Sequence, residues 1–243
     1  QSNLVIDFNN PTKQYVPSDG CIGEALSGSV YQKNFQRFMS NSKLPQLIAP
    51  IIIWVDRTHV TFNGRLGLQP IMMTFAFFTE KFCCSVTVWF VLGYIPAYDA
   101  SSAEQKGIKP GQFIRDYRCM ISAILESFRT LAYRLKGIKL PLEPTGGMMV
   151  DIVCPLLYII QDMEEGDKLC GCFKPHNKEI KRQCRACDVN FKDLANHKVE
   201  CKYVTLKNMQ HVASSNNEEL RRNWSMHFLQ NAFNDIAFMN GCY

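Results

Sequence analysis

Four residues near the end of the chain have the types and the spacing of metal ligands. Cys184 and Cys187 form a Cys-x2-Cys pair, and His197 and Cys201 form a His-x3-Cys pair that begins after nine further residues. Thiolates and imidazoles bind Zn²⁺ in closed tetrahedral sites, and we expect the second pair to place its ligands one helical turn apart. The spacing therefore predicts a structural zinc site that stabilises a segment too polar to form its own core.

Other interpretations of this stretch stay open. The cysteines can be scattered reduced thiols with a chance Cys-x2-Cys, and the nearby Cys170 and Cys172 can compete as ligands. Basic residues lead into the cluster, opposed by Glu179 alone: Lys174, Lys178, Lys181, Arg182 and Arg185. A basic zinc knuckle can contact phosphates, although a solvated basic face is the default for such charges.

Two aspartates form the second candidate site. Asp56 ends the apolar run "APIIIWVD", and Asp162 follows the apolar run "MMVDIVCPLLYII". Carboxylates at the ends of neighbouring buried strands can bridge divalent cations, and oxygen ligands suit Mg²⁺ and Mn²⁺. Two-metal sites of this kind activate water or a 3′-hydroxyl against a phosphodiester. The alternative is that both aspartates have a structural role, because aspartate is common in the turns that follow strands. His59, which stands alone, is interpreted as a hydrogen-bonded structural residue.

The elements that must position these aspartates follow an α+β order. Apolar, β-branched runs predict strands over 49–56, 71–80 and 86–96, with "RLGLQP" as a connector. Short connections between them favour an antiparallel meander. A stripe of apolar residues at helical spacing predicts a long helix over 111–137, with Gly137 at its C-cap. The apolar run over 148–160 predicts a fourth strand.

Helices are also expected at both ends of the chain. Residues 24–39 have a loose apolar face, and residues 214–233 combine a capping box at Ser215 and Glu218 with apolar residues at spacing four. We predict a polar lead-in over 1–48, a core over 49–170 and a zinc-knuckle and helical insertion over 171–243.

Composition bounds the class of protein. The 243 residues carry a formal charge of +5, which permits a polyanionic partner without requiring one. Eleven cysteines, an odd number, without a secretory signal argue against a disulfide scaffold. The longest apolar stretch contains Asp151 and Pro155 and is too short to span a membrane. We expect an intracellular protein without a membrane partner.

The chain resembles transposases of the Plavaka type through a series of short stretches in a common order. They are "SGSVYQ" at 27–32, "WVDRTHV" at 54–60, "GRLGLQPIMMT" at 64–74, "LGYIP" at 92–96, "IRDY" at 114–117, "IIQDMEEGDKLCG" at 159–171, "CRAC" at 184–187 and "NAF" at 231–233. The resemblance implies an RNase-H-like mixed sheet with flanking helices, interrupted by the zinc-binding insertion. It also implies a DDE-type acidic triad, DNA as partner and a nuclear location; a homo-oligomer stays open.

Asp56 matches the first acid of that triad and Asp162 the second, with Asp167 as a rival. The third acid is expected on a helix after the insertion, and Glu218 and Glu219 come too early for it. We therefore expect a fragment whose active site is completed beyond Tyr243.

The sequence departs from the family where basic residues are expected, at Cys83, Cys84 and Cys172.

The residues and the resemblance together indicate two candidate functions. The first is metal-dependent DNA cleavage and strand transfer at transposon ends. The second is a catalytically dead, transposase-derived protein that keeps the zinc module and DNA binding. A globular domain with an unrelated role is the third and least favoured reading.

Overall fold

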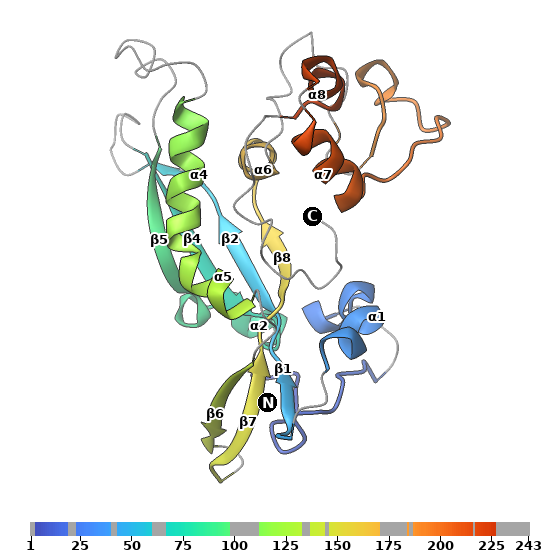
Figure 1. Cartoon of the computed structure of the whole chain (residues 1–243). Coiled ribbons are helices and arrows are strands. Elements are labelled where there is room, and N and C mark those ends of the chain that lie inside the picture. The colour runs from blue at the N-terminus through green and yellow to red at the C-terminus, as the bar shows by residue number, and fades with distance from the viewer. Residues whose placement is uncertain are drawn as a thin grey trace. The chain divides into compact units, whose positions relative to one another are not determined.

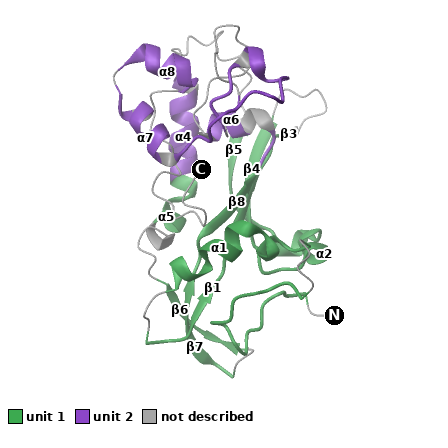
Figure 2. Cartoon of the chain, turned by 90° about the vertical axis from the view of Figure 1, so that its right-hand side faces the viewer, with its two compact units in different colours: residues 1–99, 123–160, 235–241 green, residues 100–122, 161–234, 242–243 purple. Residues whose placement is uncertain are grey.

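The computed structural model describes residues 3–18, 23–39, 43–59, 67–97, 112–132, 137–143, 146–170, 184, 187–215 and 217–226. The chain divides into two compact units (Figure 2). The first unit comprises residues 1–99, 123–160 and 235–241, and the second comprises 100–122, 161–234 and 242–243. Mixed sheets with flanking helices confirm the predicted α+β class, whereas the predicted domain boundaries stay a prediction.

A five-stranded mixed sheet forms the larger part of the first unit (Figure 1). β2 lies between β4, to which it is antiparallel, and β8, to which it is parallel. β3 and β5 both pair antiparallel with β4. The strands are β2 (Ile51–Val55), β3 (Thr58–His59), β4 (Gly67–Phe75), β5 (Phe90–Ala97) and β8 (Leu156–Ile160). The predicted antiparallel meander is therefore present, and β8 joins it in parallel beside β2.

The β2 strand is central because its sequence suits burial on both faces. Ile51, Ile53 and Val55 point to one face and are at most 3% exposed, and Ile52 on the other face is 7% exposed. A strand covered on both sides needs no polar alternation, and β-branched residues pack well on a pleated surface. The run that precedes Asp56 is thus a rigid element in the middle of the sheet.

The prediction of a connector at "RLGLQP" is wrong, because Gly67–Pro70 forms the first half of β4. This half pairs with β5 along its whole length, from Gly67 opposite Ala97 to Pro70 opposite Tyr94. On its other edge, Pro70 faces the break between β2 and β3, where a proline without an N–H removes no ladder hydrogen bond. Pairing on both sides therefore overrides the local turn signal of glycine and proline.

The predicted single strand over 148–160 is two strands in two sheets. β7 (Met148–Val153) is the middle of a three-stranded sheet, between β1 (Gln46–Ile48) in parallel and β6 (Ile138–Leu142) antiparallel. The chain then passes Cys154 and Pro155 and enters β8 in the larger sheet. Proline lacks a donor and disfavours a continuous ladder at this point.

Within the described residues the predicted helices are interrupted or begin later than the patterns indicated, and the predicted ends over 133–136 and 227–233 lie outside the described residues. The long helix is α4 (Gln112–Ile124) and α5 (Glu126–Ala132), interrupted at Leu125. Gly137 directly precedes β6, and a Cβ there would overlap the Asp151 carboxylate. The remaining helical elements are η1 (Ala25–Ser27), α1 (Ser29–Phe38), α2 (Glu80–Cys83), η2 (Val86–Val88), α6 (Met163–Cys170), η4 (Phe191–Asp193), α7 (Leu206–Ser214) and α8 (Glu218–Trp224).

The capping prediction at the C-terminal helix is also wrong. Asn217 is the N-cap of α8, since its side chain accepts from the Leu220 N–H at 3.0 Å. Ser215 instead ends α7, and its N–H donates back to the His211 carbonyl. Asparagine is at least as good an N-cap as serine, so the cap lies two residues further along.

The main core of the first unit joins α1 to both sheets. Tyr31, Phe35 and Phe38 line the buried side of α1, and Tyr31 and Phe35 meet edge to face. The strand residues of the same cluster are Leu47, Ile48, Ile52, Val150, Val153 and Leu157. This packing fixes the N-terminal ends of β2 and β8, and hence the position of their C-terminal ends.

Gly93 in β5 is required by the close approach of α4. A Cβ at this position would lie 2.8 Å from Cγ1 and 2.9 Å from Cδ1 of Ile124. We expect Gly93→Ala to lower the free energy of unfolding by about 1–3 kcal/mol, the usual cost of overpacking. Urea denaturation measures this. Gly23→Ala, where a Cβ meets nothing within 4 Å, is the control, and Gly93→Ala should cost less when Ile124 is already alanine, because the overlapping atoms are then absent.

Cys154 is a partly buried thiol that packs against the main core of the first unit. Burial raises its pKa to about 11, so the thiolate is roughly a thousandth of the total at pH 8. We expect iodoacetamide at pH 8 to label the exposed Cys84 and Cys119 long before Cys154, and Cys154 to react faster as the pH rises toward 11. Mass spectrometry of timed samples measures the order. Equal rates for Cys154 and Cys119 would contradict the burial of this thiol.

Candidate active site and zinc-binding segment

Asp56 lies at the break between β2 and β3. It is half-buried, and its Oδ1 accepts the backbone N–H of Arg57 at 2.7 Å. Within the described residues no hydrogen bond reaches its Oδ2. The strands on either side of Asp56 share one register with β4, so the carboxylate is fixed by the sheet on both sides. Asp56 thus offers one carboxylate oxygen to an external ligand.

Asp162 follows β8 as Asp56 follows β2. In the parallel β2–β8 ladder, Trp54 pairs with Ile160, and each aspartate comes two residues after its member of that pair. Asp162 is exposed, and its carbonyl accepts the Gly166 N–H at 3.0 Å at the start of α6. Because Asp162 directly precedes α6, it can also serve as the N-cap of that helix, a position where aspartate is common.

The rival Asp167 has a different setting. It lies inside α6 and is 4% exposed. Glu218 and Glu219, considered too early for the third acid, are exposed in the first turn of α8, and Glu218 pairs with Arg222 at 2.8 Å. Acidic residues in a first turn stabilise the helix through its dipole, which gives these two a local role.

Two polar side chains beside Asp56 were missed by the sequence reasoning. Arg57 and Gln69 have buried nitrogens, Nε and Nε2, that have no hydrogen-bond partner within the described part of the chain. The shared register of β2, β3 and β4 places them opposite each other, one residue beyond Asp56. The signal in the sequence was the arginine directly after the aspartate. His59 pairs through its backbone with Gly67, and its side chain lies outside the described residues.

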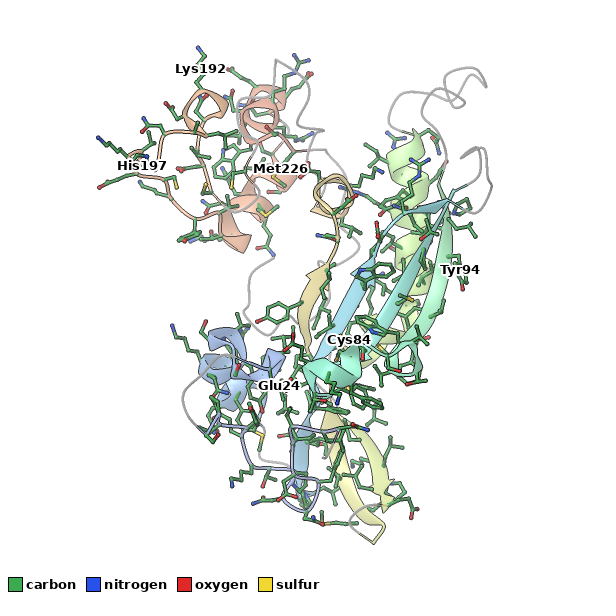
Figure 3. All side chains as sticks on the ribbon, turned by 180° about the vertical axis from the view of Figure 1, so that it is seen from behind. Glu24, Cys84, Tyr94, Lys192, His197 and Met226 are labelled. Carbon is green, nitrogen blue, oxygen red and sulfur yellow. The ribbon has the colours of Figure 1, made fainter. Side chains whose placement is uncertain are left out.

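The predicted zinc ligands all lie in the second unit. Cys184 and Cys187 are half-buried, and His197 and Cys201 are exposed; Figure 3 shows His197 on an outer loop. A bridge between Cys187 and Tyr203, with the Asp188 N–H donating to the Lys202 carbonyl at 3.0 Å, brings the backbone near Cys187 beside that near Cys201. Cys187 and Cys201, two of the four predicted ligands, thus belong to chain segments that lie side by side.

The expected helical turn between His197 and Cys201 is wrong. The chain from 196 to 199 forms turns, with the Val199 N–H donating to the Asn196 carbonyl, and no helix is assigned there. Among the described residues no group of three or more His, Cys, Asp or Glu side chains is close enough to hold a metal ion. The Cys170 side chain, Cys172 and the basic run from Lys174 to Arg182 with Arg185 lie outside the described residues.

The comparison with protein families identifies the chain. A family model described as Plavaka transposase matches residues 6–240, nearly the whole sequence. The protein therefore belongs to the Plavaka transposase family, as its short sequence stretches indicated. A search of curated proteins finds no match. Membership of a transposase family implies DNA as the partner, and within the described residues no helix is long and apolar enough to cross a membrane.

Proposed function

We propose that this chain is the catalytic region of a DDE-type transposase, in which Asp56 and Asp162 are two of the acidic ligands of Mg²⁺ or Mn²⁺. One observation carries the proposal. The parallel pair Trp54 and Ile160 puts the two aspartates at equivalent positions after neighbouring strands. Carboxylates that follow neighbouring strands can bind divalent cations together.

The strand arrangement supports an RNase-H-like core. β5, β4 and β2 form a meander in which neighbours are antiparallel, and β8 lies in parallel on the far side of β2. Between β5 and β8 the chain forms α4 and α5 and then β6 and β7, which belong to the smaller sheet, so within the larger sheet helices separate the third strand from the parallel one. This order of three strands, helix and parallel strand is the order expected of that fold, with an acid after the first and the fourth strand.

The two aspartates would hold the divalent cations that bind the reacting phosphate. Asp56 presents Oδ2 because the Arg57 N–H occupies Oδ1, and Asp162 is exposed, whereas Asp167 is buried in α6. Accessibility thus favours Asp162 over Asp167. Divalent cations, when bound, polarise a phosphodiester and lower the pKa of an attacking water. Oxygen ligands on a rigid strand end suit these hard cations.

We also propose a structural zinc ion on Cys184, Cys187, His197 and Cys201. The segment from 187 to 205 is polar, and its described side chains include none that is fully buried. Such a segment needs a crosslink or a metal to hold one fold. Because the site would use four protein ligands, its role is stability and not chemistry. A nuclear location, where such an enzyme meets chromosomal DNA, belongs to the same proposal.

The test is DNA cleavage by the full-length protein that carries this chain. A supercoiled plasmid bearing the element's ends should be nicked or linearised with Mg²⁺ or Mn²⁺ and stay intact with EDTA. Binding of the same DNA without cleavage, over a range of both cations, would favour the second function, a DNA-binding protein that no longer cuts.

A further inference from the structure

Tyr203 is the most exposed aromatic side chain of the described residues. It is 83% exposed, compared with 57% for Tyr94 and 49% for Phe90. An aromatic ring is a large, flat apolar surface with a π face, and an exposed ring can stack on a partner. Leu194 and Val199 in the same segment are also exposed, at 45% and 37%. The segment therefore leaves these apolar groups exposed instead of burying them in its own core.

The backbone on both sides of Tyr203 is fixed. Tyr203 itself bridges to Cys187, and the Lys202 N–H donates to the Asp188 Oδ1 at 2.7 Å. Two residues later Thr205 caps α7, where its Oγ1 accepts the Asn208 N–H at 3.2 Å. The backbone that carries the ring is thus held in place before any partner binds, which reduces the entropic cost of ordering this segment.

Lysines surround this position in the chain, and all of them are exposed: Lys192, Lys198, Lys202 and Lys207. None of these four lysines forms an ion pair within the described part of the chain. Asn190 and Asn196 each accept the N–H two residues on, that of Lys192 and of Lys198. Of the nearby acids, Asp188 is engaged by the backbone, Asp193 is half-buried and Glu200 is exposed.

A flat apolar group among unpaired ammonium groups fits a ligand that is both aromatic and anionic. An unpaired base of DNA has these properties, because its π face stacks on an aromatic ring while the neighbouring phosphates contact lysines. A paired base in a duplex has no free face. We propose that Tyr203 stacks on an unpaired base of DNA, with Lys198, Lys202 and Lys207 contacting the adjacent phosphates. The inference rests on the proposed function, in which DNA is the partner.

The test compares two DNA probes with the full-length, zinc-loaded protein. One is a fully paired duplex, and the other is the same duplex with a short single-stranded gap. We expect tighter binding of the gapped probe. Tyr203→Ala should weaken binding of that probe about tenfold or more and change duplex binding little, whereas Tyr203→Phe should bind like wild type. Fluorescence of 2-aminopurine in the gap reports the stacking directly and should be quenched by wild type and not by Tyr203→Ala.

Tyr94→Ala is the matched control, because Tyr94 is also an exposed tyrosine but lies in β5 of the first unit. Changing Lys198, Lys202 and Lys207 together to glutamine should reduce the dependence of log K on log salt by about 2, since each phosphate contact contributes about 0.7 on single strands. Zinc content and circular dichroism of each variant show that the fold is kept.

The outcomes separate the inference from the proposed function. Equal binding of both probes by wild type and by Tyr203→Ala overturns the role of Tyr203 and leaves the proposed function standing. Failure of wild type to bind either probe overturns the proposed function. A dimer that Tyr203→Ala abolishes in sedimentation, without a change in DNA affinity, means that this surface contacts a second copy, and it also overturns the inference.

Discussion

Asparagine at Asp56 or at Asp162 is expected to lower Mg²⁺-dependent DNA cleavage on the order of a thousandfold, with DNA affinity almost unchanged. Asparagine keeps the shape of the side chain and removes the charge that holds a cation. Asp56 is half-buried and Asp162 is exposed, so neither change opens a cavity in the core. Rates of plasmid cleavage by the full-length protein, measured beside gel-shift affinities, separate catalysis from binding.

Two other aspartates serve as comparisons for this experiment. Asp7→Asn is the matched control, because Asp7 is exposed and its Oδ1 accepts only the Asn9 N–H at 2.9 Å. Asp167→Asn tests the rival second acid. If this variant folds and loses cleavage while Asp162→Asn still cuts, then Asp167 is the second acid and the strand-end argument fails. Binding of Mn²⁺ followed by electron paramagnetic resonance gives a readout that does not depend on turnover.

The elements around Asp56 could be predicted because their signals are local and agree with their surroundings. The β-branched run of β2 is buried on both faces, as a central strand must be, and it ends at the aspartate as the sequence indicated. The helix over α4 and α5 followed from its apolar stripe, apart from the interruption at Leu125. Where intrinsic propensity, the period of the apolar residues and burial all agree, the sequence is sufficient to predict the element.

The failures have a common physical cause in long-range pairing. The apolar pattern of 148–160 is the same whether it forms one strand or two, and only the partners of β7, namely β1 and β6, decide. Gly67 and Pro70 signal a turn locally, yet β5 holds them extended over the full strand. Sequence patterns report propensity and exposure, whereas sheet membership depends on segments that lie up to about a hundred residues apart.

The candidate site shows the same division. Both aspartates could be chosen from the sequence, because each ends an apolar run. Their equivalence in the β2–β8 register could not be seen, since it requires knowing that Trp54 and Ile160 pair. The buried nitrogens of Arg57 and Gln69 that lack a partner among the described residues likewise depend on the register between β3 and β4, and the sequence signals only the arginine of this pair.

Serine at Cys184 or Cys187 is expected to lower the zinc content of the purified protein from about one ion per chain to near zero. Zinc binding in small modules of this kind supplies about 10–16 kcal/mol at pH 7, so its loss should unfold the segment from 187 to 205. Limited proteolysis should then cut this segment while the β-sheets of the first unit stay resistant. Treatment of the wild type with 1,10-phenanthroline should reproduce the effect.

The controls use cysteines of the same chain. Cys84→Ser and Cys119→Ser change exposed thiols outside the predicted ligand set and should leave zinc content at about one ion. His197→Asn and Cys201→Ser test the other two predicted ligands, and each should also lower the zinc content. If zinc survives Cys201→Ser but is lost on Cys172→Ser, the ligand set includes the Cys-x-Cys pair instead. If the wild type holds no zinc after purification without chelators, the cysteines are reduced thiols. The bridge between Cys187 and Tyr203 must then be stable without a metal, because it would be what holds the segment together.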